Sequence, residues 1–145
     1  MDFITPINSN LTIEILFGHW EKMRNHVISI GSCEESCGIL AGINNRSTFV
    51  FPATNILHSP GQFQIDPREQ LTIFKELDQN GWDLMAIYHS HPNGSSYPSD
   101  QDVNEAFYPE AINLIWSFQS SEWDCRAYKI IDNRINNAQI VLLNE

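Results

Sequence analysis

Two stretches of the chain repeat apolar residues at helical spacing. The first stripe comprises Leu16, Trp20, Met23, Val27 and Ile30. Its steps of three and four residues predict a helix over residues 17–30 that ends at Gly31. A second helix is expected to begin with Asp66 as its N-cap and Pro67 at its first position, and to stop at residues 80–81. The residues expected on its apolar face are Leu71, Phe74 and Leu77.

Short apolar segments separated by turn residues make up the rest of the pattern. They predict strands over residues 37–42, 48–51, 84–88, 112–116, 125–131 and 138–143, with a short extended segment over 62–65. Ser99 is expected to open a short third helix. Strands interleaved with helices indicate an α/β fold, with a mixed β-sheet flanked by two to three helices. Because no linker or repeat divides the chain, residues 1–145 are expected to form a single domain.

The charge balance argues against several kinds of partner. Eight basic and eighteen acidic residues give a net charge of −10, which repels nucleic-acid phosphates and anionic lipid. We therefore expect neither nucleic acid nor a membrane as a partner. The N-terminus shows no basic region followed by a long apolar stretch, so a cytoplasmic location is expected.

The three cysteines indicate neither a disulfide framework nor a four-sulfur zinc site, because their number is odd and no C-x-x-C occurs. Cys37 lies in an apolar run and is expected to be a small buried residue. A nucleophilic role for this thiol is not expected.

The sequence His89-Ser90-His91 closes a buried strand and carries the clearest chemical signal. Residues two apart in an extended chain point to the same face, so the two imidazoles are expected to converge. Imidazole is a preferred ligand of zinc. Pro92 then turns the backbone away from the sheet. The histidine pair is therefore a candidate metal site, whereas the other histidines form no comparable cluster: His19, His26 and His58.

Asp102 lies eleven residues after His91, near the start of the third predicted helix. A loop of that length can return its carboxylate to the strand end as a third ligand. A fourth tetrahedral position is then left for water, as in catalytic zinc sites. Ser99-x-x-Asp102 also matches an acidic variant of the capping box, in which Asp102 only caps the helix. The spacing alone leaves both roles open.

An attacking water also needs a proton acceptor, usually a carboxylate that is not itself a ligand. Glu34 and Glu35 precede the strand expected at residue 37 and are the candidates. Their spacing does not distinguish between them, and exposed glutamates at such positions are commonly only solvated.

Together these residues resemble the motif of the JAMM metalloproteases, also called MPN-plus or JAB domains. The family pattern is a glutamate ahead of a small apolar strand, then H-x-H, seven residues, S, two residues and D. The later part of the pattern is matched in full by His89, His91, Ser99 and Asp102. Alignment of the apolar strand on Cys37-Gly38 selects Glu35 as the glutamate. The segment 63–67 is similar to one in short bacterial members, and the likeness covers about residues 13–132.

The resemblance implies a cytidine-deaminase-like α/β fold and one Zn²⁺ per chain, held by His89, His91 and Asp102. It further implies that Glu35 takes a proton from the attacking water and passes it to the leaving amine. Ser99 would stabilise the tetrahedral oxyanion. This is the chemistry of metal-assisted amide hydrolysis.

Family members commonly cleave the amide bond after the C-terminal glycine of ubiquitin, of a ubiquitin-like protein or of a sulfur-carrier protein. The resemblance therefore implies a zinc metallopeptidase or isopeptidase that acts on a Gly-Gly tail, expected to pair as an extra strand with residues 56–66. The short chain, without long insertions, favours the compact prokaryotic branch. Two alternatives stay open: a RadC-like protein, which shares a similar H-x-H-P-x-G loop, and a metal-free MPN scaffold that binds partners.

Overall fold

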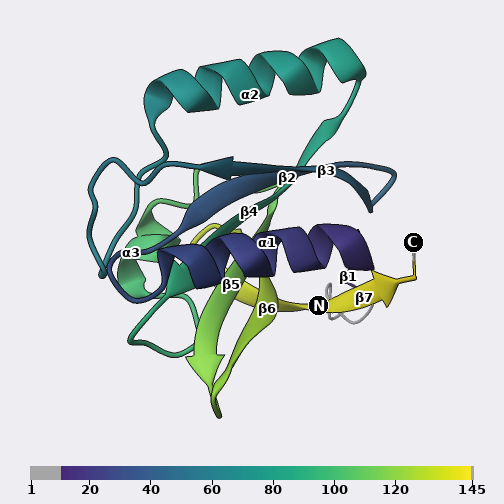
Figure 1. Cartoon of the computed structure of the whole chain (residues 1–145). Coiled ribbons are helices and arrows are strands. Elements are labelled where there is room, and N and C mark those ends of the chain that lie inside the picture. Colours follow the sequence, from purple (N-terminus) through teal and green to yellow (C-terminus); the bar gives the residue numbers. More distant parts are fainter. Residues whose placement is uncertain (1–10, 145) are drawn as a thin grey trace.

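The computed structural model describes residues 11–144 as three helices and seven strands (Figure 1). In chain order they are β1 (Thr12–Leu16), α1 (Phe17–Ile30), β2 (Cys37–Ile43), β3 (Arg46–Ala53), α2 (Pro67–Asn80), β4 (Asp83–His91), α3 (Asp100–Asn104), β5 (Ile112–Gln119), β6 (Glu122–Ile131) and β7 (Arg134–Leu143). The first two helices have the bounds predicted from their stripes and caps. No helix in this described part of the chain is long and apolar enough to cross a membrane.

The strands form a mixed sheet, as predicted, and this sheet closes into a barrel, which the sequence pattern does not predict. Neighbouring strands follow the order β1-β3-β2-β4-β5-β6-β7, and β7 returns to β1. Strand β1 is parallel to β3 and β7, and β4 is parallel to β5. Because β4 pairs with β2 on one side and β5 on the other, its C-terminal end is held firmly in place.

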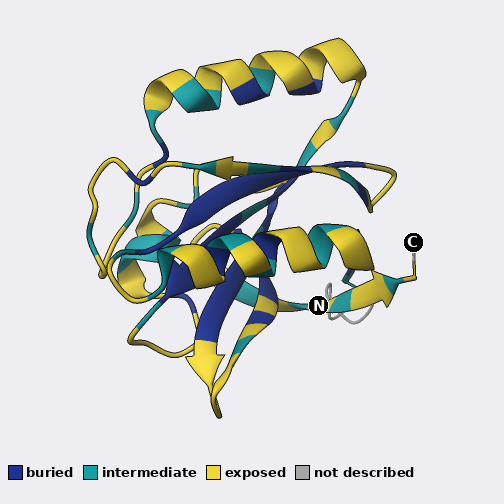
Figure 2. Cartoon of the chain, in the orientation of Figure 1, coloured by how far each residue is buried: buried dark blue, intermediate teal, exposed yellow. Residues whose placement is uncertain are grey.

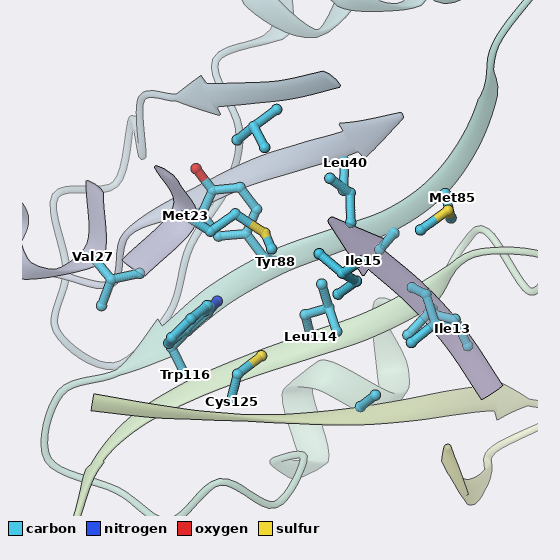
Figure 3. Packing of buried hydrophobic residues seen from close by; sticks show 14 residues of the cluster. Ile13, Ile15, Met23, Val27, Leu40, Met85, Tyr88, Leu114, Trp116 and Cys125 are labelled. Atoms are coloured by element: carbon cyan, nitrogen blue, oxygen red, sulfur yellow. The ribbon is translucent and has the colours of Figure 1, made fainter. Parts of the chain in front are cut away.

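One apolar cluster joins α1 to the sheet. Met23 and Val27 of the predicted stripe are fully buried and pack with Leu40 and Tyr88 of the sheet (Figure 3). Trp20 adds a partly buried ring to the same cluster. This packing fixes the face of β4 that carries Tyr88.

A second apolar cluster lies on the other face of β2 and β4, beneath α2 (Figure 1). Ile73 and Leu77 are the buried residues of α2, and Phe74 packs beside them. Figure 2 shows the buried positions of this helix on its side toward the sheet. The prediction that Leu71 belongs to this face is wrong: its side chain is 58% exposed. The inward stripe runs through residues 73, 74 and 77, and Leu71 lies off that stripe.

The sequence pattern also does not predict β1. Ile13 and Ile15 are fully buried at strand spacing, and Leu16 is the N-cap of α1 instead of the first position of its stripe. No turn residue separates strand from helix, so the apolar positions merge into one run.

Candidate metal centre and active site

The end of β4 brings the two predicted histidines together. Their Nε2 atoms lie 3.1 Å apart, and both side chains are buried. The two-residue step puts them on one face of the strand, while Ser90 between them points to the other. The Ser90 hydroxyl accepts a hydrogen bond from the backbone N–H of Ser36 at 2.8 Å. This contact ties the strand end to the segment that precedes β2.

The carboxylate of Asp102 reaches both imidazoles from α3. Its Oδ1 lies 3.3 Å from Nε2 of His89, and its Oδ2 lies 3.0 Å from Nε2 of His91. The capping box is present as well: Ser99 Oγ accepts from the N–H of Asp102, and Asp102 Oδ2 accepts from the N–H of Ser99. The two roles left open by the sequence are therefore compatible, because the cap orients the carboxylate toward the histidines.

The spacing of these atoms fits a metal ion. A tetrahedral site with ligand bonds of about 2.0 Å has ligand–ligand edges of about 3.3 Å. The three separations among His89, His91 and Asp102 are 3.1, 3.3 and 3.0 Å. Nδ1 of His91 also donates to the carbonyl oxygen of Ser95 at 2.7 Å. In the neutral form of the ring this contact keeps the proton on Nδ1, so that Nε2 can offer its lone pair to a metal ion.

The electrostatics of the three groups favour the neutral form of His89 and the ionised form of Asp102. Burial lowers the pKa of His89. Burial also acts to lower the pKa of His91, but hydrogen bonds to Asp102 and Ser95 outweigh it and raise the pKa. Burial acts to raise the pKa of Asp102, yet hydrogen bonds from both histidines hold it well below its usual range.

A second carboxylate, that of Glu35, faces the same histidines. Its oxygen and the ring nitrogens of His89 and His91 lie within 4.8 Å of one another. The side chain is buried, and its Oε1 has no hydrogen-bond partner among the described residues. Burial raises the pKa of Glu35 to about 8, although His91 acts to lower it. Such a group can exchange a proton near neutral pH.

The structure distinguishes Glu35 from Glu34. The carboxylate of Glu34 makes a different contact: its Oε2 lies 3.1 Å from Nδ1 of the exposed His58. Of the two glutamates considered from the sequence, Glu35 is the one that the fold brings to the histidine pair.

A cleft of about 520 Å³ opens beside these groups. The floor includes His89 and Ile87, one wall is the segment before α2, and the other wall is α3 with the residues that follow it. Residues from the two walls are Gln62, Phe63, Gln64, Ile65, Gln101, Asp102, Glu105, Phe107 and Tyr108. The predicted extended segment 62–65 thus borders the candidate active site.

The family of prokaryotic homologs of the JAB domain matches residues 20–131. The chain belongs to this prokaryotic JAB family. The match confirms the resemblance drawn from the H-x-H, Ser and Asp pattern.

This JAB protein is similar to named relatives and to a solved structure over most of its chain. It is 30% identical to the CysO-cysteine peptidase of Mycobacterium bovis over 115 residues, 77% of this chain and 79% of the relative. It is 30% identical to a desampylase of Pyrococcus furiosus over 125 residues, 86% of each chain. The solution structure of a protein from Desulfitobacterium hafniense superposes with a TM-score of 0.81 at 32% identity, covering 92% of this chain and 94% of that one.

The histidines and the cysteine that were not expected to take part in the chemistry of this JAB protein make other contacts. Nδ1 of His19 bonds Ser47, and Nδ1 of His26 lies 2.7 Å from the hydroxyl of Tyr88. Cys37 is fully buried, as expected, and burial raises the pKa of its thiol to about 12.

Two residues that support the site, Phe63 and Asn55, were not predicted from the sequence. Phe63 stacks on the ring of His89, with centroids 4.5 Å apart and planes 23° apart. The buried side chain of Asn55 holds the segment that carries Phe63, through Gln62 and Gln64. The similarity of residues 63–67 to short bacterial members is the one sequence signal that marks Phe63; nothing in the sequence marks Asn55.

Proposed function

We propose that this JAB protein is a zinc-dependent peptidase that hydrolyses the amide bond after the C-terminal Gly-Gly of a ubiquitin-like or sulfur-carrier protein. The observation that carries the proposal is the convergence of His89, His91 and Asp102 at separations of 3.0 to 3.3 Å, with the buried carboxylate of Glu35 beside them. Relatives named CysO-cysteine peptidase and desampylase support both the class of enzyme and the class of substrate.

His89, His91 and Asp102 would hold the zinc ion, and Glu35 would stay outside its ligand set. Asp102 is the better third ligand because its two oxygens lie 3.3 Å and 3.0 Å from the Nε2 atoms of the two imidazoles, close to the edges of a tetrahedral site. A zinc ion bound there supplies Lewis acidity, which activates water and polarises the scissile carbonyl. The complete ligand set favours this enzyme over a metal-free scaffold.

Glu35 acts as the proton carrier. Its unpartnered Oε1 takes a proton from water while the water oxygen forms a bond to the scissile carbonyl carbon. When the C–N bond breaks, the same carboxyl returns the proton to the leaving nitrogen. The products are a free carboxyl group on the glycine and a free amine, which together hold all the atoms of the water.

Ser99 stabilises the oxyanion of the tetrahedral intermediate. Its Oγ accepts a hydrogen bond from the N–H of Asp102, which occupies a lone pair and leaves the hydroxyl proton free to donate. Donors of this kind act where negative charge develops.

The extended segment 62–65 binds the tail of the substrate. Gln64 directs its N–H toward the side chain of Asn55 and its carbonyl toward the N–H of Ile56. In an extended segment the peptide groups of Phe63 and Ile65 then face the opposite way and are suited to pair with an added strand. Glycines at the end of that strand let its backbone pass close to His89.

Intact mass spectrometry of a ubiquitin-like or sulfur-carrier protein extended beyond its Gly-Gly tests this function. We expect two products separated at the bond after the last glycine, and none with Glu35→Gln enzyme. Replacing the last glycine with phenylalanine should abolish cleavage. Equal cutting of unrelated unfolded peptides would contradict the proposal and leave a general metallopeptidase.

A further inference from the structure

The two candidate histidine ligands are oriented in different ways. His91 is fixed by the hydrogen bond from its Nδ1 to the carbonyl of Ser95. Nδ1 of His89 is buried and has no partner within residues 11–144. Ligating histidines ordinarily donate their second N–H to a carbonyl or a carboxylate, which sets the plane of the ring. For His89, no group of the described residues sets that plane through a hydrogen bond to Nδ1.

The aromatic ring of Phe63 covers His89 instead. The two rings lie almost parallel, with centroids 4.5 Å apart and planes 23° apart. His89 is 1% exposed, so the contact is made in a closely packed environment where rotation of either ring displaces the other. The stack therefore restrains the imidazole plane without a hydrogen bond.

The segment that carries Phe63 is held by the buried side chain of Asn55. The side-chain amide of Asn55 donates to the carbonyl of Gln62 at 3.1 Å, and its oxygen accepts from the N–H of Gln64 at 3.1 Å. The Gln62 side chain also accepts from Nε2 of Gln101, the residue before Asp102, at 2.7 Å. The segment that carries Phe63 is thus tied to the loop behind it and to α3.

We propose that Phe63 is a positioning residue that fixes the His89 imidazole for metal binding, a task that no hydrogen-bond acceptor among the described residues performs. The inference rests on the proposed function only in taking His89 as a ligand. It means that the segment bordering the substrate cleft also sets metal affinity.

Zinc affinity, measured by competition with a chromophoric chelator, tests this role without any substrate. Phe63→Leu and Phe63→Met keep an apolar side chain but remove the stacking ring. We expect each to weaken zinc binding by about 10- to 100-fold, the usual effect of losing support for a ligand. Phe63→Tyr keeps the ring and should bind within a few-fold of wild type. Phe107→Leu is the matched control, because Phe107 lines the same cleft and is 73% exposed.

Binding of Co²⁺ gives a second readout, since its visible spectrum reports ligand geometry. We expect an altered spectrum for Phe63→Leu and an unchanged one for Phe107→Leu. Wild-type affinity in both folded Phe63→Leu and Phe63→Met would overturn the inference, as would equal losses in Phe107→Leu. If wild-type protein itself bound no zinc, the proposed function would fail instead.

Discussion

Glu34 and Glu35 are neighbours in the sequence but meet different surroundings, which makes them a matched pair for testing the proton carrier. Glu35 is buried beside the histidines, whereas Glu34 pairs with His58 at the surface. Glu35→Gln keeps the shape but removes the proton acceptor. We expect steady-state turnover to fall by at least about 100-fold, with zinc content and melting temperature retained.

Glu34→Gln is the control for this experiment and should have nearly normal turnover. The assignment of Glu35 would be wrong if Glu34→Gln were the inactive variant and Glu35→Gln the active one.

The raised pKa of Glu35 has a consequence for the metal-free protein. Its folded-state pKa of about 8 lies above the ordinary 4.5, so folding favours the protonated carboxyl. The associated stability is present below pH 4.5 and is lost as the pH rises through 8. Each unit of pKa difference corresponds to about 1.4 kcal/mol, so the loss amounts to a few kcal/mol. Urea unfolding in a chelator at pH 5 and pH 8.5 measures it.

Glu35→Gln removes that contribution, together with the effect of the Glu35 charge on the pKa of His91, while Asp102 and both histidines remain. We expect the free energy of unfolding of wild type to fall more steeply with pH than that of the variant. Parallel pH profiles for the two proteins would contradict the burial of an uncompensated carboxyl.

At the residue scale, local rules predict part of the site. The two-residue step predicts that His89 and His91 converge, and the fold brings them together. The choice of Glu35 over Glu34 needs the family alignment, because alternation alone does not say which of two adjacent side chains faces inward. Phe63 cannot be recognised from spacing, since its contact with His89 joins residues twenty-six positions apart.

At the scale of elements, the long helices are predictable because their signals are local. Asp66, Pro67 and Gly81 mark the two ends of α2, and the structure has Asp66 as N-cap and Gly81 in the left-handed conformation. Strand β1 escapes prediction because it passes into α1 without a turn. Leu71 shows that an apolar residue in a helix is not by itself a buried one.

The N-cap of α3 offers a prediction at the same scale. Ser99→Ala removes both the cap and the proposed oxyanion donor. Loss of the cap costs about 1 kcal/mol of stability, and loss of the donor costs about 100-fold or more in turnover. We expect a small fall in melting temperature with a large fall in kcat, while Ser99→Thr retains both functions.

Calorimetry and steady-state kinetics on the same preparations separate these roles. A large fall in melting temperature with nearly normal kcat would leave Ser99 only its capping role.

At the scale of the whole molecule, closure of the sheet into a barrel cannot be predicted from local sequence patterns. Thr12 of β1 pairs with Gln139 of β7, and no periodicity within either strand specifies a partner so distant in the chain. The mixed sheet and its flanking helices follow from the order of elements, and the closed sheet does not. The site depends on this global arrangement because its parts come from three places in the chain. Glu35 lies before β2, the two histidines end β4, and Asp102 lies on α3.

Metal content by elemental analysis tests the central claim most directly. Protein purified without chelator should contain about one zinc per chain, because two imidazoles and one carboxylate form a catalytic-type site. His89→Ala and Asp102→Ala should each lose most of that metal, whereas Glu35→Gln should retain it. Full zinc occupancy in both His89→Ala and Asp102→Ala would contradict the account.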